Sequence, residues 1–269
     1  MAKYKKKRAR ELKHDKFRDT AMRIMDRIGD RLEGKGRTIL YAIAGVIVVV
    51  VLVGLIVRWS NRRADEARHA LGRAIAIATT PVSATPVPGS STPGFSSEQE
   101  RAQKAIEEFQ KVAAKYGDPY GTEARYFIAT NLLYIDRNKG ISDLSGLTSS
   151  GNHDVAELSK FALAQAKEGD GKYDEAAALY RELAGQNGTV VSAESANLRL
   201  ALVYERQGKK KEAADLLFNI VDAARKAKDQ ENNPAPQSQA ARDAAQELQK
   251  LDPARYEQLP PEPVPNLPF

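Results

Sequence analysis

The chain of 269 residues contains no cysteine and only three histidines, so several kinds of chemistry are excluded at the outset. Without cysteine there can be no disulfide framework, thiolate metal site or cysteine nucleophile. His14, His69 and His153 stand far apart in the sequence, without the spacing of metal ligands. We therefore expect no metal site and no cofactor.

Residue patterns of catalytic sites are missing as well. Glu107 and Glu108 are adjacent carboxylates, which project from different sides of a helix and do not form an acid–base pair. The segment "GDGKYDEAA" lacks the spaced oxygen ligands of a calcium loop, and "EGKGR" lacks the spacing of a phosphate loop. We expect no enzymatic activity and no small-molecule substrate. One cluster of apolar and aromatic residues is expected to belong to the core rather than to a ligand cage: Tyr126, Phe127, Leu133, Tyr134 and Phe161.

Excess positive charge is absent from most of the chain, although the formal net charge is +6. Residues 1–37 hold 14 Lys plus Arg against 6 Asp plus Glu, and the remaining residues hold 27 against 29. Basic residues spread over a folded face indicate nucleic-acid binding. A basic cluster next to a membrane span instead orients the span and attracts anionic lipids. The clustering favours the membrane interpretation, and no nucleic-acid partner is expected.

The basic cluster directly precedes residues 38–57, a run of 20 residues without a charged side chain. Twenty helical residues rise about 30 Å, the thickness of the hydrocarbon core of a bilayer. A cleaved signal has a shorter apolar stretch that ends in small residues, but this run is followed by "RWSNRR". No other segment is comparably apolar and able to cover the run in a soluble core. The sequence therefore predicts a single transmembrane helix at 38–57, in contact with the lipid bilayer.

Charge on the two flanks of the span predicts its orientation. Residues 1–37 are the more basic flank, although Arg58, Arg62 and Arg63 follow the span. The positive-inside rule places 1–37 in the cytosol and 58–269 across the membrane. A basic amphipathic helix in residues 1–37 would lie on the anionic inner leaflet, or dock onto a partner such as a ribosome or another membrane protein. An amphipathic helix in the head is predicted by apolar residues at helical spacing: Phe17, Ala21, Ile24, Met25, Ile28 and Leu32.

Proline is nearly absent from residues 97–228, where Pro119 is the one exception, and strand-like alternation is missing there. We therefore expect an all-α fold. Capping-box spacing marks helix starts at Ser97 with Glu100 and at Asp154 with Glu157. The predicted organisation is a basic cytosolic head (1–37), a transmembrane helix (38–57), a post-membrane helix (58–79), a Pro/Ser/Thr-rich linker (80–96), a helical repeat domain (97–228), and a short helix with a Pro-rich tail (229–269).

Two segments of the repeat domain align with a period of 37 residues: "FALAQAKEGDGKYDEAAALYREL" and "LRLALVYERQGKKKEAADLLFNI". Small residues let two antiparallel helices approach, a glycine ends the first helix, and a bulky residue fills the groove. The earlier "AIEEFQKVAAKYGDP" matches the second helix alone, and "GTEARYFIATNLLYIDRNKG" resembles a first helix whose partner has decayed into "ISDLSGLTSSGNHD". Units of this kind stack into a solenoid. The matched pairs are Ala164 with Ala201, Gly171 with Gly208, Ala176 with Ala213, and Tyr180 with Leu217.

The segment "ALVYERQGKKKEAADLL" resembles the tetratricopeptide repeat, with Leu217 in place of the usual aromatic residue. The whole layout, with "ADEARHALGRAI" and "AIEEFQKVAAKYGDPYGTEARYFIAT", is similar to the YfgM family of ancillary SecYEG translocon subunits in the bacterial inner membrane. The resemblance implies a single-pass protein with a periplasmic tetratricopeptide-like α-solenoid. It also implies the Sec translocon, periplasmic chaperones or nascent chains as partners. The amphipathic head, the Pro-rich linker and the Pro-rich tail depart from the family pattern.

By the same resemblance, side chains of the first helices line a concave groove that binds partner proteins. The leucines and Phe161 fit a role in packing equally well. The sequence thus predicts a non-catalytic interaction scaffold of the Sec translocon. The alternative is a structural adaptor that links the inner membrane to cell-envelope or division machinery. The residues predicted on the groove are Ser195, Leu198, Leu202, Glu205 and Arg206 in the last unit, and Leu158, Phe161, Gln165 and Glu168 in the preceding one.

Overall fold

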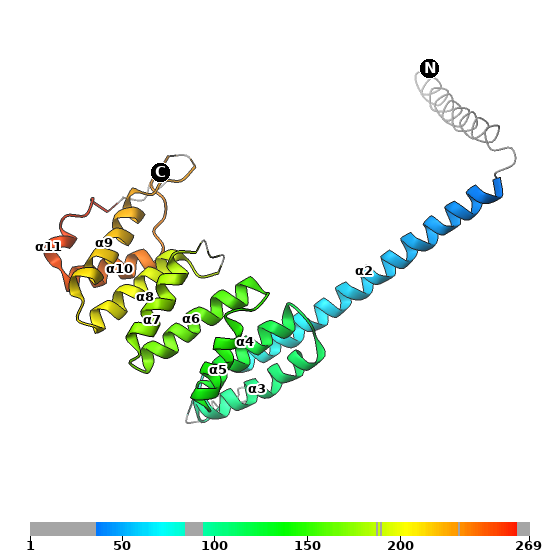
Figure 1. Ribbon diagram of the computed structural model, residues 1–269, viewed down its shortest axis with the longest axis horizontal. Coiled ribbons are helices and arrows are strands. Elements are labelled where there is room, and N and C mark those ends of the chain that lie inside the picture. Colours follow the sequence, from blue (N-terminus) through cyan, green and yellow to red (C-terminus); the bar gives the residue numbers. More distant parts are fainter. Residues whose placement is uncertain (1–35, 84–93, 187, 189, 231, 263–269) are drawn as a thin grey trace, which may run out of the picture. The chain divides into compact units, whose positions relative to one another are not determined.

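A computed structural model describes residues 36–83, 94–186, 188, 190–230 and 232–262, and its regular elements are all α-helices (Figure 1). The predicted all-α fold class is confirmed. The amphipathic helix predicted in the head falls outside the described residues, as do most of the Pro-rich linker and the last seven residues of the tail. The chain divides into two compact units, and the boundary in the sequence falls between Asp65 and Glu66.

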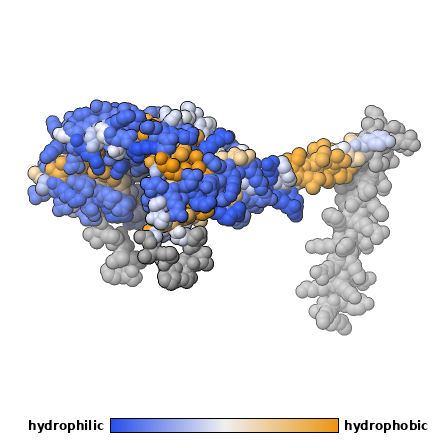
Figure 2. Space-filling view, turned by 90° about the horizontal axis from the view of Figure 1, so that it is seen from below, coloured by the Kyte–Doolittle hydropathy of each residue, from blue (hydrophilic) through white to orange (hydrophobic). Residues whose placement is uncertain are grey.

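The first described helix, α2 (Gly36–Ala78), contains the apolar run. Within Tyr41–Ala78 a window of 18 residues has a mean hydropathy of 2.7, and none of it is buried, so the helix is long and apolar enough to cross a membrane. The large apolar side chains between Tyr41 and Val57 are each 51–76% exposed. Figure 2 shows this stretch as continuous hydrophobic surface, whereas the visible surface of the helical repeats is mostly hydrophilic.

The unit that begins at Glu66 is a stack of helical hairpins with a tetratricopeptide-like repeat fold (Figure 1). Most helices pack against their neighbours in sequence. The short helix expected in the tail is α10, the last long helix of the stack. In order, the helices after α2 are α3 (Glu98–Lys115), α4 (Tyr120–Leu132), α5 (Arg137–Leu147), α6 (His153–Gly169), α7 (Tyr173–Ala184), α8 (Ala193–Arg206), α9 (Lys210–Lys226), α10 (Gln239–Leu251) and α11 (Pro253–Tyr256).

The 37-residue period corresponds to two successive hairpins, α6–α7 and α8–α9. The repeated alanines of all four helices are completely buried, and Tyr180 and its counterpart Leu217 are buried at the positions next to them. A side chain larger than alanine at these crossings would hold the two helices of a hairpin apart. The alignment therefore identified the contacts that hold each hairpin together.

The glycines of the period occupy the same turn in both hairpins. Gly171 has φ 72° and Gly208 has φ 76°, a backbone conformation that costs glycine no steric strain. Each glycine N–H donates to the carbonyl three residues earlier, that of Glu168 at 3.0 Å or Glu205 at 2.9 Å. The following N–H donates to the carbonyl five residues earlier, at 2.9 Å in both turns. This pair of bonds is the Schellman motif, which ends the first helix and satisfies its last carbonyls.

The segment "ISDLSGLTSSGNHD" was expected to have lost its helix, but this is wrong, because α5 extends to Leu147. Gly140 and Leu144 are buried four residues apart, like the alanine and the bulky residue of the other second helices. A Cβ atom at Gly140 would lie 2.9 Å from the backbone oxygen of Ala129 and from the backbone nitrogen of Leu133. Glycine thus replaces the repeat alanine where α5 lies too close to the backbone of α4 for a Cβ atom, and the sequence comparison missed this unit for that reason.

One of the two predicted helix starts is correct. Ser97 caps α3 by accepting a hydrogen bond from the N–H of Glu100. The other start is wrong, since α6 begins at His153 and Asn152 is its cap. The carboxylate of Glu157, expected to complete a capping box, is instead buried and accepts hydrogen bonds from the N–H groups of the loop between α7 and α8.

The end of α2 forms the first hairpin together with α3. Leu71 and Ala74 are buried in one cluster with Ala105 and Phe109 of α3, the residues that match the second helix of a repeat. The partner of α3 therefore lies before the Pro-rich segment. The two ends of that segment lie side by side, because Val82 and Phe95 form an isolated β-bridge and Phe95 is buried.

Candidate partner-binding groove

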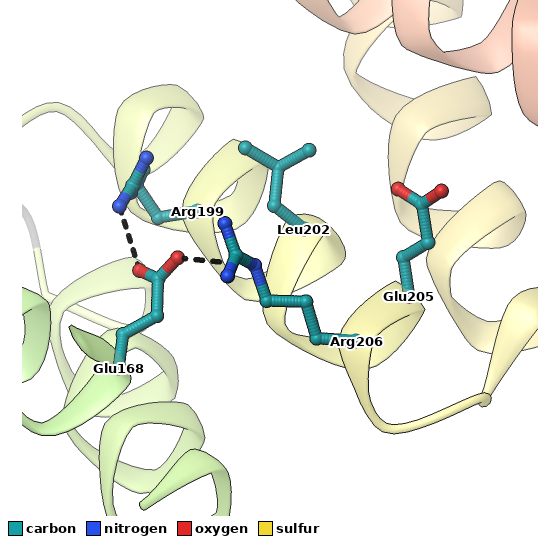
Figure 3. Close-up of a pocket in the computed structure, with 5 residues that line it drawn as sticks. All are labelled: Glu168, Arg199, Leu202, Glu205 and Arg206. Atoms are coloured by element: carbon teal, nitrogen blue, oxygen red, sulfur yellow. Dashed lines mark hydrogen bonds and ion pairs between the residues drawn. The ribbon is translucent and has the colours of Figure 1, made fainter. Parts of the chain in front are cut away.

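Two hollows lie among the first helices of the hairpins. The smaller has a volume of about 380 Å³ and is formed by α6 and α8 (Figure 3). Its lining residues are Glu168, Arg199, Leu202, Glu205 and Arg206. The larger, of about 590 Å³, is lined mainly by α4 and α6, together with residues from the end of α2, α3 and α5.

The structure brings four of the predicted groove residues together in the smaller hollow: Glu168, Leu202, Glu205 and Arg206. Gln165 lines the larger hollow. Ser195 belongs to the cap of α8, where its N–H donates to the hydroxyl of Ser192 at 3.1 Å. Leu198 is buried in the core between α8, α9 and α10, so it has the packing role. Leu158 and Phe161 pack against the core of α6, α7 and α8.

A buried carboxylate, that of Glu168, organises the smaller hollow. The residue is only 5% exposed, and its Oε2 lies 2.6 Å from Nη2 of Arg199 and accepts the hydroxyl hydrogen of Tyr180 at 3.1 Å. Its Oε1 forms a longer ion pair of 3.7 Å with Nε of Arg206. A buried charge without a partner is strongly destabilising, whereas hydrogen-bonded counterions offset the loss of hydration. Glu168 therefore ties three helices, α6, α7 and α8, to one another.

Tyr180 supplies the hydroxyl that completes this cluster. Burial raises the pKa of Tyr180 to about 12, so the hydroxyl remains a donor throughout the physiological range. The corresponding position holds Phe109 in α3, Leu144 in α5 and Leu217 in α9, none of which can donate. Neither Arg199 nor the role of Tyr180 was predicted from the sequence. The sequence feature that could have indicated this contact is a tyrosine at a repeat position that is otherwise apolar, opposite a glutamate.

The larger hollow has an aromatic wall. Phe127 stacks on Phe109 at a centroid distance of 4.9 Å, and Tyr126 meets Phe127 edge-on at 5.3 Å. Tyr126, Phe127 and the half-exposed Tyr134 all line the hollow. Of the cluster assigned to the core, Phe161 packs edge-on against Tyr180 at 5.7 Å. Tyr126 and Phe127 pack against the core and also have an accessible surface. Tyr134 is 51% exposed, so its assignment to the core is wrong.

Polar bridges connect consecutive hairpins beside these hollows. Nε of Arg137 lies 2.5 Å from Oδ1 of Asp170, and its Nη2 donates to the carbonyl of Ala166 at 2.7 Å. Gln207 donates to the carboxylate of Asp174 at 2.9 Å. These bridges keep the turns of α4–α5, α6–α7 and α8–α9 in register. The hollows therefore lie on a surface held by both core packing and polar contacts.

Within the described ranges, no three histidine or carboxylate residues come together as metal ligands. The hollows instead combine aromatic and aliphatic surface with a few oriented charges. Such surfaces bind polypeptide segments through side-chain contacts and hydrogen bonds.

No family model matches the sequence, and no curated protein matches it. The structure is similar to that of a kinesin-light-chain-type protein from Podosopora anserina, described as having nearly identical TPR-like repeats. The TM-score is 0.45 and the identity 18%, over 59% of this chain and 81% of that chain. A variant of the same protein matches with the same score and identity, over 59% of this chain and 80% of that one.

Proposed function

We propose that this protein is a membrane-anchored, non-catalytic scaffold that binds other polypeptides through the groove of its helical repeats. The exposure of the apolar run of α2 carries the proposal. Thirteen large apolar side chains between Tyr41 and Val57 are more than half exposed. Transferring such side chains from water to an apolar medium releases about 1.5–3 kcal/mol each when burial is complete. The total, on the order of 20 kcal/mol, favours a bilayer around this segment.

The orientation proposed has residues 1–37 in the cytosol and 58–269 on the far side of the bacterial inner membrane. The greater positive charge of the first segment supports this. Trp59 lies just after the run, with the guanidinium of Arg63 4.7 Å from its ring centroid. Aromatic and basic side chains of this kind favour the headgroup region of a membrane.

The partners proposed are the Sec translocon, with periplasmic chaperones or emerging polypeptides bound in the groove. The similarity of the layout to the YfgM family supports this part of the proposal. The repeat fold supports it as well, because stacked hairpins present a continuous surface of side chains to an extended partner. The adaptor function, with partners in the cell envelope or division machinery, remains the alternative.

Three experiments test the proposal. In a protease-protection assay, protease added from the periplasmic side should digest residues 58–269. Digestion only from the cytosolic side would refute the orientation. A photo-reactive amino acid at Gln165 or Leu202 should crosslink to translocon subunits, chaperones or secretory chains, whereas the same probe at exposed Lys211 of α9 should not. Crosslinks only to envelope or division proteins would favour the adaptor, and the absence of translocon subunits from native-level purifications would contradict the Sec assignment.

A further inference from the structure

Glu168 and Glu205 occupy the same backbone position in consecutive hairpins. They are 37 residues apart, and each lies in the last turn of a first helix, α6 or α8. The carbonyl of each accepts the N–H of the left-handed glycine three residues later, at 3.0 and 2.9 Å. The two side chains therefore start from equivalent places in their own hairpins.

Their surroundings differ because the second helices differ. Glu168 receives the hydroxyl of Tyr180 from α7 and is buried. In the next hairpin Leu217 occupies the position of Tyr180 and offers no hydrogen-bond donor. Glu205 is exposed and lines the smaller hollow.

The first helix that follows each glutamate also differs. For Glu168 that helix is α8, and its Arg199 pairs with the carboxylate at 2.6 Å. For Glu205 the next helix is α10, which carries two cations. Arg242 donates to the carbonyl of Gln237 at 2.5 Å, and Lys250 pairs with Glu247 of its own helix at 2.8 Å. Among the residues that the structure describes, no cation pairs with Glu205.

The smaller hollow presents this carboxylate next to an apolar side chain. Figure 3 shows Arg199 and Arg206 turned toward Glu168, with Glu205 on the other side of Leu202. The positive charge of both arginines is thus directed to Glu168. An arginine or lysine side chain has an apolar stem and a cationic end, which match Leu202 and the Glu205 carboxylate.

We infer that Glu205 is a specificity-determining residue, which binds an arginine or lysine side chain of the polypeptide held in the groove. Within the same chain, Glu168 already binds an arginine, Arg199, from the equivalent repeat position. The inference rests on the proposed function, because it names the chemistry of the partner that the groove would take.

The test uses the full chain in a mild detergent and an immobilised library of random twelve-residue peptides. The wild-type protein should enrich peptides that contain arginine or lysine. Glu205→Gln should weaken binding of the best basic peptide by about threefold, the size of one exposed ion pair. It should leave the affinity for the same peptide with glutamine at that position unchanged. Glu212→Gln, at an exposed glutamate on α9, is the matched control and should have no effect.

Glu205→Arg should reverse the preference toward acidic peptides. The inference is overturned if the wild type shows no preference for basic peptides, or if Glu205→Gln binds the basic peptide as tightly as the wild type does. In both cases peptide binding itself would still support the groove. Failure of the wild type and all variants to bind any peptide would instead refute polypeptide binding by the groove, and the role of Glu205 with it.

Discussion

Replacing Tyr180 with phenylalanine removes one oxygen atom from the centre of the Glu168 cluster. The hydroxyl donates to the buried carboxylate at 3.1 Å, and it accepts a weaker bond from Nε of Arg199 at 3.5 Å. A hydrogen bond to a charged group contributes roughly 1.5–3 kcal/mol to stability. The ring would still fill its place, as Leu217 does in the next hairpin, so almost no cavity is added. We expect Tyr180→Phe to lower the free energy of unfolding by about 2 kcal/mol.

Tyr204→Phe is the matched control. The hydroxyl of Tyr204 accepts a hydrogen bond from Arg181 at 2.8 Å on the exposed surface of the same region. Losses at such surface positions are usually within about 0.5 kcal/mol. Unfolding of both variants in urea would be followed by circular dichroism at 222 nm, with the full chain in detergent micelles.

A second substitution tests whether the carboxylate charge is responsible. In Glu168→Gln the hydroxyl of Tyr180 faces a neutral amide, so Tyr180→Phe should cost less in that background than in the wild type. The role assigned to the Tyr180 hydroxyl is refuted if Tyr180→Phe is no more destabilising than Tyr204→Phe. It is also refuted if the loss is the same with and without the charge at residue 168.

Because burial raises the pKa of Tyr180 to about 12, the contribution of its hydroxyl to stability is complete below pH 10 and is lost as the pH rises toward 12. Denaturation at alkaline pH should show this loss in the wild type and not in Tyr180→Phe. Gly171→Ala and Gly208→Ala should each lower the free energy of unfolding by about 1–2 kcal/mol, since both residues have left-handed backbones. Urea midpoints that differed widely between the two variants would contradict the equivalence of the turns. Gly140→Ala should lower the free energy of unfolding by about 1–3 kcal/mol although it restores the repeat alanine, because the new Cβ would lie 2.9 Å from backbone atoms. Gly146→Ala in the same helix has open space for the Cβ and should be neutral or stabilising.

Several features could be predicted because they depend on contiguous sequence. A run of 20 uncharged residues defines a potential span by its length alone. The 37-residue period repeats small residues, a glycine and a bulky residue at fixed spacing, and the structure confirms that these residues are the buried contacts and the turn of each hairpin. Of the groove, Glu168, Leu202, Glu205 and Arg206 were predicted by the resemblance to the tetratricopeptide repeat, and they line one hollow.

Other features depend on which side chains meet across helices. Only the packing of α6, α7 and α8 shows that Glu168 is buried with Tyr180 and Arg199 while Glu205, at the equivalent position, stays exposed. The tertiary structure also adds the end of α2 as the partner of α3, and α5 as the helix behind an atypical glycine. A repeat in the sequence determines the backbone of each hairpin, because helix ends and crossings are local. The environment of a groove side chain is decided by contacts across helices: Glu168 meets Tyr180, 12 positions away in the second helix of its own hairpin, and Arg199, 31 positions away in the next hairpin.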